Sequence, residues 1–111
     1  MLDAESVDVI QLDATCCKGF TGFVKAAAIA ASFGCLVSAH CAPPLHMQVA
    51  CAVPQFRHVE YFHDHARIEA MLFDGFIRPK DGELTPDRWR TGMGLLFGHA
   101  DAERFLVWRS Q

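Results

Sequence analysis

The chain has 111 residues, 51% of them hydrophobic, and a net charge of −3 with histidine counted as neutral. These totals are typical of one small folded domain and exclude a disordered chain. They also exclude the basic surface that nucleic acids require, and no apolar run reaches the ~20 residues that span a bilayer. We therefore expect no nucleic acid and no membrane among the partners. Five cysteines without a C-x-x-C pair predict reduced thiols in the cytoplasm.

Apolar patterns along the first half of the chain predict alternating strands and helices. In chain order, the strand, helix, strand, helix and strand are 6–13, 21–34, 35–40, 43–53 and 56–62. Thr21 is placed to cap the first helix, and Gly34 lies where a helix-ending glycine is expected. Strands that alternate with helices over short links predict a parallel sheet with right-handed crossovers. The predicted fold class is therefore α/β.

The pattern changes after the third predicted strand. Gly, Pro and Asp become frequent, so we expect loops, turns and short extended pieces, with 103–108 as a candidate final strand. His63 and His65 have a spacing that a metal site could use, but their polar surroundings favour a position on the surface. Trp89 and Trp108 are expected to be packing residues.

Three polar residues come at the ends of the three predicted strands. Asp13 ends the first strand, His40 ends the second, and Glu60 lies near the end of the third. The carboxyl ends of neighbouring parallel strands meet at one edge, about 5 Å apart, and α/β proteins bind ligands there. Asp13 should therefore reach one side of the His40 ring, and Glu60 should flank the other side.

An acid–histidine pair of this kind can transfer protons. The acid bonds one imidazole nitrogen, which sets the tautomer and makes the other nitrogen a better base. His40 could then take or return a proton, and Glu60 could donate a hydrogen bond to a substrate oxygen. The alternative is a solvated histidine at a strand end beside two unrelated acids. His46, in the first turn of the second helix, either contacts the substrate or is a polar residue near a helix start.

Several stretches of the sequence are similar to a known family of barrel enzymes. The most specific are the Asp13–His40–Glu60 order, the stretch SAHCAPPLH, and the ending LFDGFIRPKDGELTPDRW followed by GMGL. From about residue 6 to about residue 108 the chain resembles the C-terminal barrel segment of the enolase superfamily, in its mandelate racemase/muconate lactonizing enzyme branch. The resemblance implies the C-terminal part of a TIM-type (β/α) barrel. The last three strands and two helices would occupy 1–62, and a closing segment of the same domain would occupy 63–111.

The resemblance also implies a reaction and roles for the three polar residues. In mandelate racemase-like members, an Asp–His dyad on the sixth and seventh strands acts as general base or acid, and a Glu on the eighth strand hydrogen-bonds the substrate carboxylate. Asp13, His40 and Glu60 match these positions one by one. The implied reaction is removal of the proton α to a carboxylate, in a racemase or an acid-sugar dehydratase. The implied substrate is a small carboxylic or sugar acid.

The family's remaining machinery corresponds to strands that precede this segment. In the family, three acids on the third to fifth strands hold Mg²⁺, and a Lys motif on the second strand supplies the opposite base. The resemblance therefore implies Mg²⁺ in the complete enzyme, no metal ligand in this chain, and negligible activity of the chain alone. Lys18 stands where the family commonly has a glycine, which implies an altered backbone in the loop after Asp13.

Three interpretations of the chain remain open at this level. It is a C-terminal fragment of a magnesium-dependent enzyme, or an inactive remnant that self-associates without turnover, or one chain of a split barrel. Strands cut from a closed barrel have free edges, and a piece of this size buries a modest fraction of its surface. We therefore expect the chain to associate with itself or with the missing part of the barrel.

Overall fold

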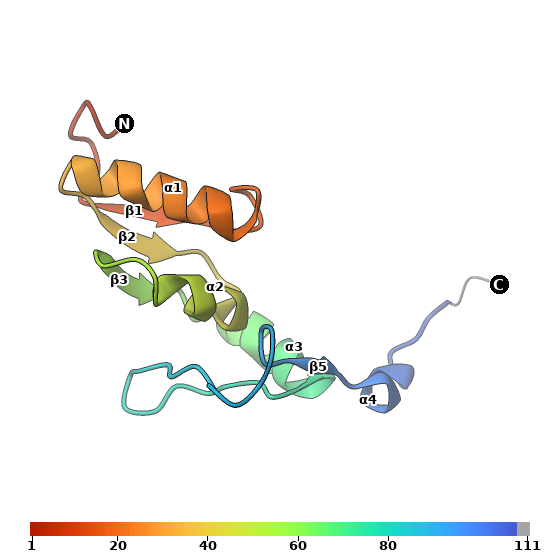
Figure 1. Cartoon of the computed structure of the whole chain (residues 1–111). Coiled ribbons are helices and arrows are strands. Elements are labelled where there is room, and N and C mark those ends of the chain that lie inside the picture. The colour runs from red at the N-terminus through yellow and green to blue at the C-terminus, as the bar shows by residue number, and fades with distance from the viewer. Residues whose placement is uncertain (109–111) are drawn as a thin grey trace.

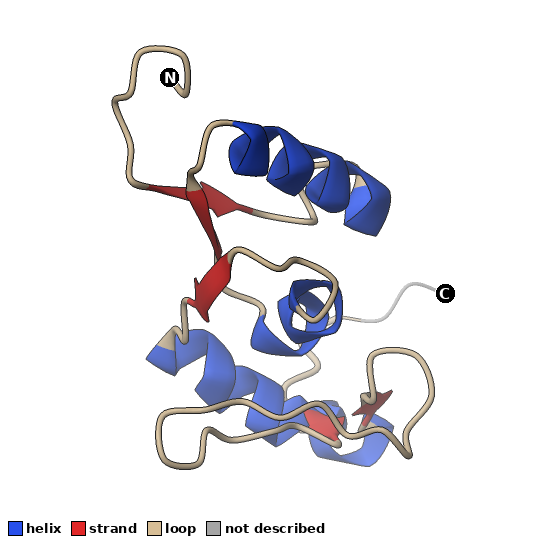
Figure 2. Cartoon of the chain, turned by 60° about the vertical axis from the view of Figure 1, so that its left-hand side comes forward, coloured by secondary structure: helices blue, strands red, loops and turns tan. Residues whose placement is uncertain are grey.

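Three short parallel strands form the centre of the protein, as a computed structural model that describes residues 1–108 shows. The strands β1 (Val9–Leu12), β2 (Leu36–Ala39) and β3 (Phe56–Val59) lie in the order β1-β2-β3, side by side in Figure 1. The helices α1 (Gly19–Ser32) and α2 (Pro43–Ala50) connect them and lie on the same side of the sheet (Figure 2). The predicted β-α-β-α-β parallel unit is confirmed, although most of its elements are shorter than predicted.

The strand register separates an apolar face from a polar face. Ile10 pairs with Val37 and Leu12 with Ala39, and these side chains join the core beneath the helices. Successive side chains of a strand point to opposite faces, so Gln11, between Ile10 and Leu12, lies on the face away from the helices. The core contains these residues, apolar side chains of the two helices and one side chain from the loop after α2: Phe23, Ala27, Ala30, Val49 and, in the loop, Val53. On this polar face, the next side chain along each strand therefore belongs to the residue just beyond the end of that strand.

Helix α1 ends as predicted but begins earlier than predicted. Gly34 has φ 68°, its N–H donates to the Ala31 carbonyl at 3.0 Å, and the Cys35 N–H donates to the Ala30 carbonyl at 3.0 Å. These bonds satisfy the last carbonyls of the helix. The Thr21 cap is wrong, because the helix begins at Gly19 after Lys18, which lies in the left-handed region at φ 63°. Lys18 thus adopts a backbone conformation that glycine favours, at a position where the family commonly has a glycine.

The first turn of α1 packs on the backbone of the loop that precedes it. A Cβ added to Gly22 would collide with the Cys17 carbonyl group. We expect Gly22→Ala to lower the free energy of unfolding by about 2–3 kcal/mol, because the loop after β1 must move to admit a methyl group. Urea unfolding checks this, with Lys25→Ala, at an exposed position of the same helix, as the control. An equal loss in both variants would contradict it.

The C-terminal part contains more regular structure than predicted. Helix α3 (His63–Leu72) occupies a segment for which we expected loops and turns. The prediction was wrong because Ala66, Glu69 and Ala70 recur at helical spacing and form the half-buried or buried side of this helix, a pattern that the polar HDH stretch obscured. His63 and His65 are exposed on its outer side, as predicted.

The chain then closes with a small antiparallel pair and a short helix. Strands β4 (Phe73–Asp74) and β5 (Leu96–Phe97) pair, and α4 (His99–Glu103) follows. The candidate strand at 103–108 is therefore wrong, since α4 includes Glu103 and the described residues after it, 104–108, form no strand. The last three residues of the proposed closing segment, 109–111, lie outside the described residues.

The overall shape is open. The radius of gyration is 16.2 Å, against ~13 Å for a compact domain of this length. Trp89 is 96% exposed and Trp108 is 76% exposed, so neither packs against the rest of the described chain, and the expectation that they cover the end of the barrel stays a prediction for the complete barrel. In Figure 1 the segment that follows α4 extends away from the sheet. Within residues 1–108, no helix has the length and apolar character needed to cross a membrane.

Candidate proton-transfer site

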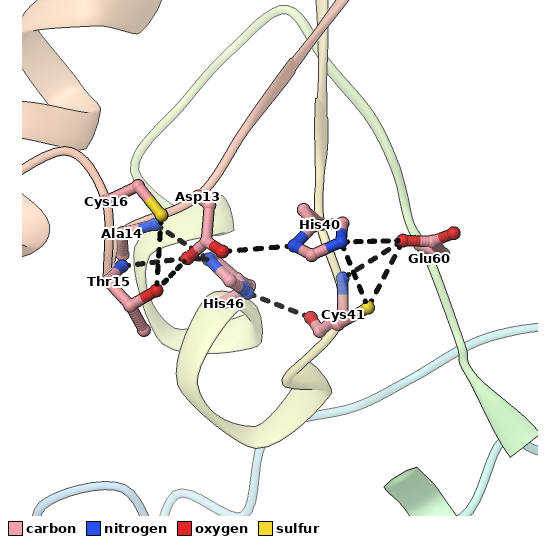
Figure 3. A network of polar contacts seen from close by, with 8 residues as sticks. All are labelled: Asp13, Ala14, Thr15, Cys16, His40, Cys41, His46 and Glu60. Carbon is pink, nitrogen blue, oxygen red and sulfur yellow. Dashed lines mark hydrogen bonds and ion pairs between the residues drawn. The ribbon is translucent and has the colours of Figure 1, made fainter. Parts of the chain in front are cut away.

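The three predicted polar residues lie together where the three strands end. The ladder continues one residue beyond β2 and β3, because the His40 N–H donates to the Leu12 carbonyl and the Glu60 N–H to the Ala39 carbonyl, both at 2.9 Å. Asp13, His40 and Glu60 therefore occupy neighbouring positions on the polar face. Figure 3 shows the His40 ring between the two carboxylates. The predicted juxtaposition is confirmed.

The imidazole of His40 is oriented by Asp13. Its Nδ1 lies 3.0 Å from Asp13 Oδ2, and its Nε2 lies 3.8 Å from Glu60 Oε2. A carboxylate can only accept a hydrogen bond, so Nδ1 carries the proton and Nε2 presents its lone pair. The ring is 51% exposed. This geometry gives His40 an accessible nitrogen that can accept a proton.

Asp13 is held in its charged form by its own loop. The Thr15 N–H and the Thr15 hydroxyl both donate to Oδ1, at 2.8 and 2.7 Å. Burial of the Asp13 carboxyl opposes ionisation, but the hydrogen bonds from the Thr15 hydroxyl, from His40 and from the Thr15 backbone lower its pKa from 3.8 to about 2. Asp13 is therefore a fixed negative charge beside the ring.

This pKa shift predicts an acid-sensitive contribution to stability. A carboxyl whose pKa is lower in the folded state stabilises the fold fully above its unfolded pKa of 3.8, and this stabilisation is lost as the pH falls to about 2. Over that range we expect the wild-type free energy of unfolding to fall by about 1 kcal/mol more than that of Asp13→Asn, after allowing for solvent screening. Urea unfolding at a series of pH values measures this difference. Parallel pH profiles of the two proteins would contradict it.

His46 braces the site from beneath. Its ring is fully buried, it accepts a hydrogen bond from the Ala14 N–H at Nε2, and Nδ1 donates to the Cys41 carbonyl, both at 2.9 Å. These bonds join the loop after Asp13 to the turn after His40. A substrate contact, which we predicted as one alternative, would require the ring to leave both bonds.

Cys41 is a member of the site that sequence reasoning missed. Its Sγ lies 3.4 Å from His40 Nε2 and 3.3 Å from Glu60 Oε2, and its N–H donates to the same oxygen. Burial and the neighbouring Glu60 raise the pKa of this thiol. Strand alternation would have placed the side chain opposite His40, but Cys41 has φ 47°, which turns it back toward the histidine. Only its position directly after a strand-end histidine could have indicated it.

The chemistry of these donors does not suit magnesium. Within residues 1–108, one group of three ligating side chains has its donor atoms within 4.8 Å of one another, and it consists of His40, Cys41 and Glu60. Mg²⁺ prefers an octahedron of oxygen atoms, whereas this group offers one nitrogen, one sulfur and one oxygen.

Comparison with known proteins identifies the family. A family model described as enolase C-terminal domain-like matches residues 1–100. The chain belongs to the enolase C-terminal domain-like family. Among curated proteins, sequence comparison finds no match. The enolase-like assignment confirms the resemblance seen in the sequence, and with it the barrel-segment fold.

Solved structures of the same branch share this enolase-like segment. A mandelate racemase/muconate lactonizing enzyme-like protein from Rubrobacter xylanophilus is 44% identical with a TM-score of 0.85, over 91% of this chain and 28% of that one. A mandelate racemase/muconate lactonizing enzyme from Polaromonas sp. JS666 is 30% identical with a TM-score of 0.75, over 89% and 26%. L-talarate dehydratase from Polaromonas sp. JS666, complexed with Mg and L-glucarate, is 29% identical with a TM-score of 0.75, over 90% and 26%. The chain thus spans 26–28% of the length of these proteins.

Proposed function

We propose that this chain supplies the proton-transfer side of a magnesium-dependent racemase or acid-sugar dehydratase. The observation that carries the proposal is the Asp13–His40 pair, with 3.0 Å between carboxylate and ring and with Nε2 turned to the open side of the strand ends. His40 would act as the general base that removes the proton α to the substrate carboxylate. Asp13 would orient the ring and stabilise the imidazolium that forms.

We assign substrate binding to Glu60 and return of the proton to the protonated His40 ring. Glu60 is 38% exposed and lies on the Nε2 side of the ring, where it could hydrogen-bond the carboxylate end of a substrate. In a dehydration, the imidazolium of His40 would return its proton to the departing β-hydroxyl. In a racemisation, His40 would act on one face of the α-carbon, and the opposite base, from outside this chain, would act on the other face. The same three side chains therefore serve either reaction.

The rest of the catalytic machinery would come from outside this chain. The related L-talarate dehydratase structure contains Mg and L-glucarate, which favours a sugar acid as the substrate and magnesium as the cofactor of the complete enzyme. The donor set at the strand ends is not a magnesium site, so we expect the metal to be held by acids on the missing strands. The five free cysteines favour a reducing, cytoplasmic environment.

An isotope-exchange experiment tests this function. The matching 28% of the Rubrobacter xylanophilus protein is replaced by this chain, which completes the barrel. The chimera, its parent and the isolated chain are incubated in D₂O with Mg²⁺ and a panel of α-hydroxy and sugar acids, and loss of the α-proton is followed by ¹H NMR. We expect exchange by the chimera on an acid that the parent accepts, and none by the isolated chain.

Two results would overturn the proposal. Exchange by the isolated chain at the rate of the chimera would show that the missing strands are not needed. A folded chimera without exchange, beside an active parent, would favour the alternative of a remnant that has lost its activity.

We also propose that the open sheet makes this chain associate with another protein chain. Within residues 1–108, β1 and β3 each pair only with β2, and α1 with its C-terminal cap carries apolar side chains that are 40–57% exposed: Phe20, Val24, Ile29 and Phe33. Free strand edges and exposed apolar surface favour binding to another copy or to the missing barrel part. We expect sedimentation velocity to give a species larger than a monomer, and a concentration-independent monomer would contradict this.

A further inference from the structure

A nitrogen, a sulfur and an oxygen atom converge at the end of β2 in a small triangle. The Cys41 Sγ is 3.4 Å from His40 Nε2 and 3.3 Å from Glu60 Oε2, and the third side, from Nε2 to Oε2, is 3.8 Å. Figure 3 shows the three atoms facing one another. Tetrahedral zinc binds such atoms at about 2.0–2.3 Å, which places neighbouring ligands about 3.3–3.7 Å apart. The triangle therefore already has nearly the size of one face of a zinc tetrahedron.

We propose that His40, Cys41 and Glu60 form a binding site for Zn²⁺ or a similar thiophilic divalent cation. One histidine nitrogen, one cysteine sulfur and one carboxylate oxygen are ligands that zinc accepts together. This site is different from the magnesium site proposed for the complete enzyme, because a sulfur ligand disfavours Mg²⁺. It does not depend on the proposed reaction, since metal binding needs only these three side chains.

The surroundings of His40 support metal binding. Asp13 accepts the Nδ1 proton of the ring at 3.0 Å, which leaves the lone pair of Nε2 directed toward the triangle. Zinc-bound histidines commonly donate their other nitrogen to a carboxylate in this way, which orients the ring and strengthens the bond to the metal. The bonds from Thr15 hold the carboxylate of Asp13 in place.

Access to the triangle is open on one side. The side chains of His40 and Glu60 are 51% and 38% exposed, whereas Cys41 is 7% exposed and forms the floor. A metal seated on the three ligands could thus take water as its fourth ligand, as in open zinc sites. Binding converts the Cys41 thiol to a zinc-bound thiolate and releases its proton to solvent, so affinity should increase with pH.

Metal binding at this triangle would have a chemical consequence for the site. The Nε2 lone pair that would accept a substrate proton would instead be bonded to zinc. Zinc and substrate should therefore compete for His40, and a chelator should restore a histidine that zinc has occupied.

Cobalt(II) provides a spectroscopic probe that requires no turnover. The purified chain is titrated with Co²⁺ at neutral pH under reducing conditions, and Zn²⁺ is then added. We expect one equivalent of Co²⁺ to produce the intense d–d bands of a tetrahedral site and a thiolate-to-cobalt charge-transfer band. Zn²⁺ should remove both, and an excess of Mg²⁺ should remove neither.

Conservative variants assign the ligands. Cys41→Ser should abolish the charge-transfer band and weaken Zn²⁺ binding by at least about 100-fold, and Glu60→Gln should also weaken it. Asp13→Asn should weaken binding by about 10–100-fold without removing the sulfur band, because Asp13 acts through His40. The double variant Cys16→Ser/Cys51→Ser is the matched control, because it removes two exposed thiols and should bind as the wild type does.

Two outcomes would overturn the proposal. The band and the affinity could survive in Cys41→Ser and disappear in Cys16→Ser/Cys51→Ser, which would assign the metal to exposed thiols. Alternatively, the folded wild-type chain, checked by circular dichroism, could show no tetrahedral cobalt spectrum. Neither result bears on the proton-transfer proposal, which is tested by isotope exchange.

Discussion

Replacing His40 by asparagine should lower the rate of α-proton exchange by about 10³-fold in the completed barrel. Asparagine keeps a polar group beside Asp13 but has no nitrogen that can accept a proton. The remaining hydrogen bonds, including those of Thr15 to Asp13, do not involve the ring and should persist. The loss should therefore appear in the rate constant rather than in the amount of folded protein. The measurement is α-proton loss in D₂O by ¹H NMR.

A matched variant separates the role of this histidine from a general effect of losing an imidazole. His63→Asn changes a ring on α3 whose side chain is 89% exposed, so it should exchange at the wild-type rate. Zinc must be removed from every sample with a chelator, and the chelator dialysed away before Mg²⁺ is added, because the proposed zinc site shares the Nε2 atom. Retention of the wild-type rate in His40→Asn would place the base elsewhere.

Replacing His46 by leucine should lower the free energy of unfolding by about 3 kcal/mol. Leucine fills most of the volume but leaves the Ala14 N–H and the Cys41 carbonyl without their partners. Each buried polar group left unsatisfied costs about 1–3 kcal/mol. The ring also packs against Phe23, with centroids 5.7 Å apart, so the change disturbs the core beneath the site. Urea unfolding at neutral pH measures the loss.

Two further variants define this effect. His46→Gln can form one of the two bonds and should lose about half as much stability. His63→Leu, on the exposed side of α3, should change stability by no more than about 0.5 kcal/mol. A loss for His46→Leu no larger than that for His63→Leu would contradict the bracing role.

Much of this site depends on backbone conformations that residue identity disfavours. Lys18, Cys41 and Ala42 all have positive φ, at 63°, 47° and 38°, although none is glycine. Such conformations are held only where surrounding contacts determine them, so no local pattern in the sequence could predict them. Cys41 has its sulfur beside His40 and Glu60 only because of its positive φ, and this is why sequence reasoning missed it.

The sequence by itself determined the order of elements and the place of the dyad. Strand alternation, helical spacing and Gly34 are local patterns, and they predicted the parallel unit and the meeting of Asp13 with His40. A helix at 63–72 was also encoded locally, in Ala66, Glu69 and Ala70, but the prediction overlooked it.

Only the tertiary structure decided which atoms the site contains. His46 hydrogen-bonds Ala14, and Cys41 contacts Glu60, because segments distant in the chain pack together there. Trp89 and Trp108 stayed exposed because packing requires a partner surface, which residues 1–108 do not provide for them. The physical reason is that the spacing of apolar residues shows only which face of a helix or strand is buried. The contacts of a single side chain depend instead on the three-dimensional arrangement of the whole fold.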